Sequence, residues 1–245
     1  MDKLVYLAAQ AAKGTMARQD NIANNLANVN TPGFRQQLMA FQAAPVMGEG
    51  SGTRAFATET SVGYDTTPGQ IQATGRDLDV AVQGKGWFAV TAPNGTEAYT
   101  RNGSFEIDAT GNLVTQEGYA VIGTAGPINV PPNHRVSFEA DGTVSAIPLT
   151  GEPTVVNLGQ LKLVDAEDTP MVRSDDGLFR AKNGQELEDN PEVRIAGGFI
   201  EGSNVNAVDM MVQMIAAARQ YETQMKMIST AQENDRAANS LYGMN

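Results

Sequence analysis

The chain has 245 residues, of which 41% are hydrophobic and 18% charged, so it can bury a core and is not a disordered acidic chain. Its formal net charge of −11 at pH 7 repels phosphate backbones and argues against nucleic acid as a partner. Because the chain has no cysteine, disulfides, thiolate nucleophiles and cysteine-ligated metal sites are excluded.

The first predicted element is a helix over residues 2–28. This segment has no proline and one glycine, and small or apolar residues recur at helical spacing from Leu4 to Leu26. Pro32 and Gly33 end it, because the residue before proline avoids the helical region and glycine accepts a positive φ. The segment lacks the basic and unbroken apolar regions of a secretory signal, so if the protein leaves the cytoplasm we expect a route without a cleaved signal peptide.

The middle of the chain has the period of β-strands. Residues 46–63 are rich in Gly, Ser, Thr and Ala, and we interpret them as an irregular connector. Residues 64–202 contain short runs that alternate apolar and polar side chains, such as residues 78–82 and 136–147. Turn signals such as Asp141-Gly142 separate these runs, which predicts an antiparallel β domain.

A second helix is predicted from about Ser203 to Leu241. Ser203, Asn204 or Asn206 can cap its start, and Gly243 can end it. Its apolar stripe follows steps of three and four residues and consists of Val208, Met211, Ile215, Ala218, Tyr221, Met225 and Ile228.

The predicted fold class is therefore α+β. Long N- and C-terminal helices pair as a hairpin or coiled coil, and an antiparallel all-β domain is inserted between them. The expected parts are residues 1–45, the N-terminal helix and following segment of a helical core domain; 46–63, the connector; 64–202, a β-rich outer domain; and 203–245, the C-terminal helix of the helical core domain.

Each terminal helix carries a narrow stripe of small and flexible apolar residues. Such a stripe fits an ordinary surface helix on the β domain, or a helix buried against copies in neighbouring subunits. We favour the second interpretation, because a stripe this thin cannot build a stable core from one helix pair. A head-to-tail assembly of such helices grows instead of closing. The candidate assembly residues are Leu4, Ala8, Ala11, Ile22, Asn25, Leu26, Asn28, Val208, Met211, Ile215, Ala218, Tyr221, Met225 and Ile228.

The sequence offers little catalytic chemistry. His134 is the only histidine, so no histidine-assembled zinc site can form, and a Ser-His-Asp triad would need His134 itself. Asp77 and Asp79 could be paired catalytic carboxylates on one strand, but we prefer a solvated face. We predict no enzyme activity, no cofactor and no catalytic, cofactor-binding or metal-binding residue.

Five segments resemble the flagellar rod and hook protein family. Residues 23–35, which end in Thr31-Pro32-Gly33-Phe34-Arg35, are similar to its N-terminal signature, and residues 201–206 with 219–222 resemble its C-terminal signature. Residues 78–88 and 99–105 resemble the β domain of its larger members. The resemblance spans nearly the whole chain and implies a structural subunit of the bacterial flagellar basal-body rod, which assembles through its terminal helices into a torque-transmitting shaft.

Within this family the opening residues 1–6, Pro32 and residues 36–46 favour the F type, a proximal rod protein, over the G type, a distal rod protein. The resemblance implies other rod proteins, and copies of the chain itself, as partners. It also implies type III export, a place in the rod where it crosses the periplasm, and terminal helices that order only on assembly. The alternative from another class is an extracellular β-domain adhesin or binding module with a helical stalk.

Overall fold

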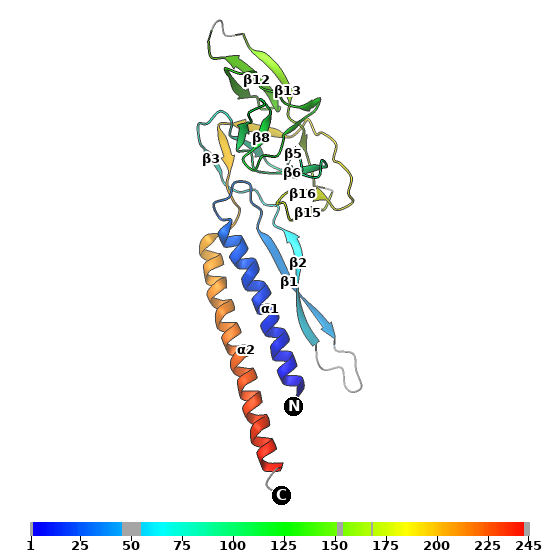
Figure 1. Cartoon of the computed structure of the whole chain (residues 1–245), viewed down its shortest axis with the longest axis vertical. Helices are drawn as coiled ribbons and strands as arrows, with labels where there is room; N and C mark the ends of the chain where they lie inside the picture. Colours follow the sequence, from blue (N-terminus) through cyan, green and yellow to red (C-terminus); the bar gives the residue numbers. More distant parts are fainter. Residues whose placement is uncertain (1, 46–54, 151–153, 168, 243–245) are drawn as a thin grey trace. The chain divides into compact units, whose positions relative to one another are not determined.

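The computed structural model describes residues 2–45, 55–150, 154–167 and 169–242, which form two compact units (Figure 1). Residues 1–29, 36–65 and 205–245 make up the helical unit, and residues 30–35 and 66–204 make up the β unit. The predicted α+β class, with two terminal helices and an inserted set of antiparallel strands, is confirmed.

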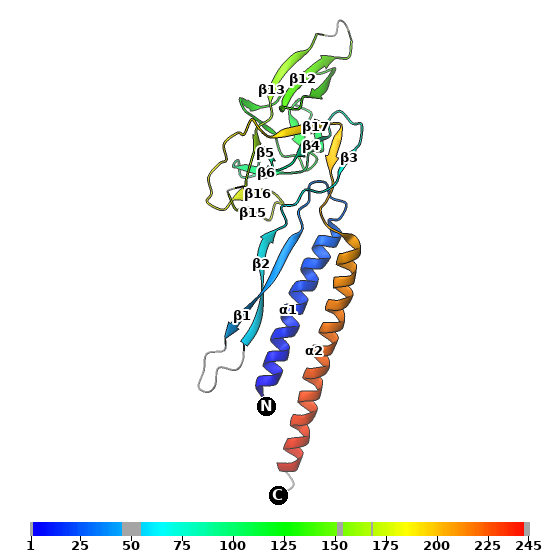
Figure 2. The same cartoon turned by 180° about the vertical axis from the view of Figure 1, so that it is seen from behind.

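The helical unit is built on two long helices, α1 (Asp2–Ala27) and α2 (Ala207–Tyr242). They lie side by side and antiparallel, with the start of α1 and the end of α2 toward the same end of the unit (Figures 1 and 2). The Oδ1 atom of Asn206 accepts hydrogen bonds from the backbone N–H groups of Val208 and Asp209, at 3.0 and 3.2 Å, so Asn206 is the N-cap of α2. The predicted stop at Gly243 lies outside the described residues.

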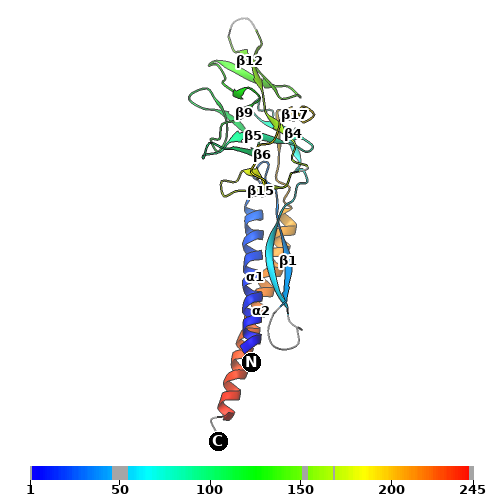
Figure 3. The ribbon, with the colours of Figure 1, turned by 90° about the vertical axis from the view of Figure 1, so that its right-hand side faces the viewer.

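A two-stranded antiparallel ribbon, β1 (Gln37–Pro45) and β2 (Ala55–Tyr64), packs against α1 in the same unit (Figure 3). The sequence predicted an irregular connector over residues 46–63, and this prediction is wrong for residues 55–63. Their Thr, Val and Ala content tolerates an extended backbone, and the pairing with β1 supplies the ladder hydrogen bonds. Residues 46–54 lie outside the described part of the chain.

All paired strands of the β unit are antiparallel. The largest sheet has the order β14 (Leu163–Val164), β5 (Trp87–Thr91), β6 (Glu97–Thr100), β16 (Phe179–Ala181) and β15 (Met171–Arg173). A three-stranded sheet contains β11 (His134–Phe138), β12 (Thr143–Pro148) and β13 (Val156–Gln160). Four further pairs are β3 (Ile71–Ala73) with β18 (Phe199–Glu201), β4 (Val80–Gln83) with β17 (Arg194–Gly197), β7 (Phe105–Ile107) with β8 (Leu113–Thr115), and β9 (Ile122–Gly123) with β10 (Gly126–Pro127).

The core of the β unit comes from the inward residues of these short strands. Phe88 and Phe105 are fully buried and meet edge to face, with ring centroids 5.2 Å apart. Val80, Val82 and Val90 pack in the same cluster. The core therefore holds together strands that are individually only two to six residues long, and it gives the chain segments that enter the unit a rigid support.

Candidate functional site

The inner face of α2, which is the side that is buried within the chain, consists mainly of small and polar side chains. On α2 the buried residues Met210, Ala217, Gln224 and Ala231 follow one another at seven-residue intervals. Thr15 on α1 donates a buried hydrogen bond of 3.0 Å from Oγ1 to Oε1 of Gln224. Small residues allow the helices to approach closely but bury little apolar area, so this face alone stabilises the pair weakly.

A second face at the start of α2 is apolar and exposed. Val208, Met211, Val212 and Ile215 are 71%, 52%, 61% and 56% exposed, and we call these four residues the outer face of α2. At about 100° per residue they lie on the opposite side of the helix from Met210. The first turns of α2 are therefore apolar on nearly every side, which is typical of a helix that is buried all round.

The predicted assembly residues fall into three groups in the structure. Those buried within the helical unit are Ala8, Ile22 and Asn25, and those half-buried are Leu26, Asn28, Ala218, Tyr221 and Ile228. Those exposed are Ala11, Val208, Met211, Ile215 and Met225. The side chain of Leu4 lies outside the described part of the chain. The exposed members remain available to a neighbouring molecule, and an interface role for the whole set stays a prediction.

Asn25 has partners within its own unit. Its Nδ2 donates to the carbonyl oxygen of Gln37 at 3.0 Å, and its Oδ1 accepts from the backbone N–H of Gln37 at 2.9 Å. Asn21 Oδ1 accepts a further bond from Nδ2 at 3.1 Å. The side-chain amide thus pairs with the backbone as another strand would, and it fixes the start of β1 beside α1.

In the β unit, Glu201 is sandwiched between two buried arginines, and we call Arg35, Arg101 and Glu201 the clasp. Arg35 Nη2 lies 2.9 Å from Glu201 Oε1, and Arg101 Nε lies 3.0 Å from Glu201 Oε2. Both arginine side chains are 2% exposed and that of Glu201 is fully buried. Both contacts are ion pairs removed from water, and the contact between Arg101 Nε and Glu201 Oε2 is electrostatic without the geometry of a hydrogen bond.

Backbone groups complete the clasp. Glu201 Oε1 also accepts from the N–H of Gly69 at 2.8 Å. Arg101 donates to the carbonyl oxygens of Gly84, at 2.6 Å, and of Gly86. Arg35 donates to the carbonyl oxygen of Thr67. The clasp therefore joins chain segments that are far apart in sequence through three buried charged side chains.

The clasp holds two cations for one anion. The pKa of Arg101 is lowered to about 10, mainly because the side chain is buried. The negative charge of Glu201 acts in the opposite direction, and the positive charge of Arg35 adds to the lowering. Arg101 therefore stays charged at neutral pH. Trp87 lies near both guanidinium groups, with its ring centroid 5.9 Å from Cζ of Arg35 and 5.8 Å from Cζ of Arg101, and offers them the negative face of its ring.

The backbone around the clasp is packed too closely for side chains. Gly33 donates its N–H to the carbonyl oxygen of Glu201 at 2.8 Å and has φ +67°. A Cβ at this position would lie 2.4 Å from backbone atoms of Arg101 and Asn102. Gly33 is therefore required both by its positive φ and by the close approach of two backbones.

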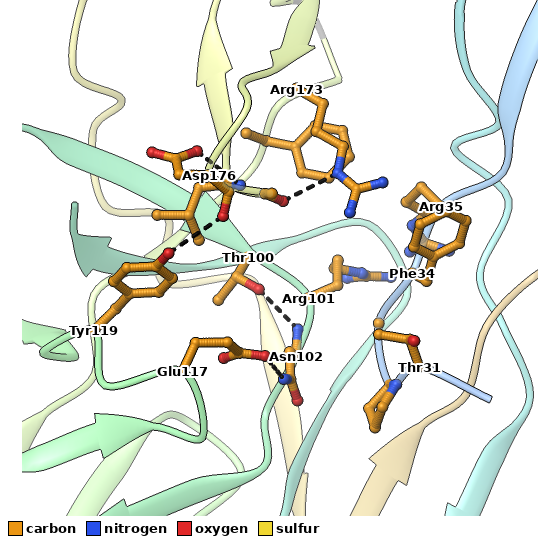
Figure 4. Close-up of a pocket in the computed structure, with 15 residues that line it drawn as sticks. Thr31, Phe34, Arg35, Thr100, Arg101, Asn102, Glu117, Tyr119, Arg173 and Asp176 are labelled. Atoms are coloured by element: carbon orange, nitrogen blue, oxygen red, sulfur yellow. Dashed lines mark hydrogen bonds between the residues drawn. The ribbon is translucent and has the colours of Figure 1, made fainter. Parts of the chain in front are cut away.

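A cavity of about 220 Å³ opens beside the clasp within the β unit (Figure 4). Phe34, Arg101 and Arg173 line it, and Cζ of Arg173 lies 4.6 Å from the centroid of the Phe34 ring. The polar groups seen in Figure 4 largely bond one another, as when Asn102 Nδ2 donates to Glu117 Oε1 at 3.0 Å. Its walls are thus part of the packing around the clasp.

Asp77 and Asp79 each bind an arginine of their own, and no hydrogen bond joins the two described carboxylates. Asp77 accepts two bonds from Arg135, at 2.6 and 2.7 Å, and Asp79 accepts from Arg76 at 2.5 and 2.9 Å. Burial alone would raise the pKa of Asp79, but the hydrogen bonds from Arg76 and its charge lower it overall. Asp79 is 5% exposed, so the interpretation of a solvated face is wrong for this residue.

The described residues contain no group of three or more His, Cys, Asp or Glu side chains placed to hold a metal ion. Within the same residues, neither helix has a stretch long and apolar enough to cross a membrane.

Sequence reasoning missed the clasp and the inner face of α2. The inner face had a readable signal, since Met210, Ala217, Gln224 and Ala231 are spaced as one position of a heptad. The clasp had a weaker signal, namely a charged residue within each of three glycine-containing segments that carry the family resemblance. Nothing in the sequence indicated that these three charges meet.

Models of flagellar proteins match all three parts of the chain. "Flagella basal body rod protein" matches residues 6–35, "Flagellar hook protein FlgE/F/G D1 domain" matches residues 81–146, and "Flagellar basal body rod FlgEFG protein C-terminal" matches residues 196–241. Two terminal helices and an inserted β unit, each matched in order, define the class of flagellar axial structural proteins.

Relatives of full length narrow this class. The chain is 48% identical over 252 residues to the flagellar basal-body rod protein FlgF of Salmonella typhimurium and equally to that of Escherichia coli, covering 100% of each chain. It is 32% identical to the rod protein FlgG of Bacillus subtilis, over 95% of this chain and 96% of that one. The chain belongs to the flagellar basal-body rod proteins, as a structural subunit, and the prediction of the F type is confirmed.

Proposed function

We propose that the protein is built into the rod by its terminal helices, with the outer face of α2 buried against helices of neighbouring rod subunits. The observation that carries this proposal is that the first turns of α2 are apolar on two opposite sides. Met210 and Ala217 are covered by the rest of the helical unit, whereas Val208, Val212 and Ile215 have more than half of their surface in water.

The outer face offers enough apolar surface to matter. Burying a Val, Ile or Met side chain completely contributes roughly 1.5–3 kcal/mol. Covering the exposed parts of these four residues would therefore stabilise an interface by on the order of 5 kcal/mol. The occupant is a helix of the same family, because the weak α1–α2 seam needs further packing along its length and an array of such seams grows into a shaft. Methionine at position 211 can adapt to neighbours that are not identical.

The remaining candidate residues contribute to this interface to different degrees, and some act only within the chain. Met225, exposed farther along α2, extends the contact, and the half-buried Ala218, Tyr221 and Ile228 form its edge. Ala8, Ile22 and Asn25 act within the chain by fixing α1 against α2 and the ribbon. A shaft made of such seams transmits torque because long, dehydrated contacts between subunits resist sliding.

We further propose the setting in which the protein works. Its partners are proximal and distal rod proteins and copies of itself, and it reaches the rod where this crosses the periplasm through the flagellar type III export apparatus. It has no catalytic role. Family membership supports each of these points, and detecting the protein in purified basal bodies and its loss from them in an export-deficient strain would test partners, place and route.

Substituting Ile215 by Glu tests the interface. Glutamate keeps the helix propensity but puts a carboxylate into a seam that must lose its water, so incorporation into basal bodies should fall at least tenfold. The control is Gln220→Glu, which adds the same charge at an exposed polar position of α2. Incorporation and motility are measured by quantifying the protein in isolated basal bodies and by swimming assays. Equal incorporation of Ile215→Glu and Gln220→Glu would refute the proposed interface.

A further inference from the structure

The clasp lies where the chain passes between the two units. The units divide the chain at 29/30, 35/36, 65/66 and 204/205. Arg35, Thr67, Gly69 and Glu201 stand within four residues of three of these points, and hydrogen bonds or ion pairs join them to one another. Every segment that leads toward α1, the ribbon or α2 is therefore tied to its neighbours inside the β unit.

Two backbone bonds strengthen this connection. Gly33 donates to the carbonyl oxygen of Glu201 at 2.8 Å, and Asn204 donates to the carbonyl oxygen of Phe34 at 3.3 Å. The Asn204 side chain also donates from Nδ2 to the carbonyl oxygen of Thr67 at 3.1 Å. Short lengths of chain remain outside the clasp, namely residues 28–34 after α1 and residues 202–206 before α2.

We propose that the clasp is a positioning device for assembly, which holds the inner ends of the two helix-forming segments together so that α1 and α2 meet in one register. Arg35, Arg101 and Glu201 are then positioning residues for the rod interface. The role in rod assembly rests on the proposed function. The effect of the clasp on how often α1 and α2 meet does not, because it is a property of the isolated chain.

The size of the effect follows from chain lengths. With the β unit unfolded, α1 and α2 are joined by roughly 180 residues, whereas the clasp shortens the connection to roughly 14 residues. Because the probability of contact falls as about the −3/2 power of loop length, folding of the β unit raises the effective concentration of the helices roughly 50-fold.

Opening the clasp alone has a smaller effect. If Arg35 is released while β3 and β18 stay paired, the connection runs from residue 28 to the start of β3 at Ile71, and back from Glu201 to α2. This is roughly 48 residues, so the effective concentration should fall about sixfold. The ribbon and α1 remain covalently attached to the β unit, so opening the clasp lowers only how often α1 and α2 meet.

The test measures this concentration in the purified full-length monomer. Thr15→Cys and Gln224→Cys place two thiols where the side chains now share a hydrogen bond, and the chain has no other cysteine. A bismaleimide reagent attached to one thiol closes onto the other at a rate that reports how often α1 and α2 meet. Glu201→Gln should slow this closure about sixfold.

The matched control is Asp176→Asn, which also neutralises a carboxylate bound to an arginine, Arg180, but joins residues only four apart. Its closure rate should equal that of the parent. Emission of the single tryptophan, Trp87, which lies against both clasp arginines, reports whether the clasp has opened while the β unit stays folded. If Glu201→Gln unfolds the β unit, Arg35→Lys is the second variant, because lysine keeps the charge but cannot reach Glu201 and Thr67 together.

The result that overturns the proposal is an unchanged closure rate in a variant whose Trp87 emission shows the clasp open. Equal slowing by Asp176→Asn would overturn it as well. Failure of the rod interface gives a different pattern, in which Ile215→Glu is incorporated as well as Gln220→Glu while Glu201→Gln still slows closure. The two proposals can therefore fail separately.

Discussion

The charge balance of the clasp predicts which substitution in it destabilises the β unit most. Glu201→Gln keeps the shape of the side chain but removes the carboxylate that both guanidinium groups, each 2% exposed, contact. Removing one partner of a buried ion pair typically costs about 3–5 kcal/mol, since the remaining charge is uncompensated. We expect Glu201→Gln to lower the free energy of unfolding of the β unit by an amount in this range.

Arg101→Met should cost less, because it leaves Arg35 and Glu201 as a matched pair. Its main penalty is the loss of donors to two carbonyl oxygens, of which that of the exposed Gly84 can bind water and that of the buried Gly86 cannot. An unsatisfied buried acceptor costs about 1–3 kcal/mol. The difference between the two variants should therefore be on the order of 2 kcal/mol.

Urea unfolding followed by the emission of Trp87 measures both losses in the full chain. The double variant Arg101→Met with Glu201→Gln leaves one cation instead of two, so its loss should be smaller than the sum of the single losses. Asp176→Asn serves as the control for neutralising a partly exposed carboxylate. The reasoning is refuted if Arg101→Met destabilises the β unit as much as Glu201→Gln, or if the two losses simply add.

Two further predictions concern single side chains. Hydrogen bonds and charge from Arg76 hold the folded-state pKa of Asp79 below its ordinary value. The stability that Asp79 contributes is therefore present above pH ~4 and is lost as the pH falls through the folded-state pKa. Asp79→Asn should make the free energy of unfolding depend less on pH in the acid range, and an unchanged dependence would show that other carboxylates set it. Asn206→Ala removes the N-cap of α2 and should cost about 1 kcal/mol, visible as faster hydrogen exchange of the first amides of α2; exchange as slow as in the parent would mean that the cap is dispensable.

The sequence determined the elements whose signals are local. The helical spacing of apolar residues, the break at Thr31-Pro32-Gly33 and the cap at Asn206 predict α1 and α2, because helices satisfy their backbone within a few residues of chain. Alternation and turn residues also predicted an antiparallel β unit, because a tight turn pairs two strands that follow each other in sequence, such as β5 with β6 and β11 with β12. The family resemblance lay in contiguous segments and was therefore also readable.

Only the tertiary structure decided which partners the residues take. It divided the apolar residues of α2 into an inner face and an outer face, gave Asn25 to the backbone of Gln37, and paired residues 55–64 with β1. It also brought Arg35, Arg101 and Glu201 together from positions up to 166 residues apart. A salt bridge or strand pair between distant segments leaves no periodic trace in sequence, because its geometry is set by how the whole core packs.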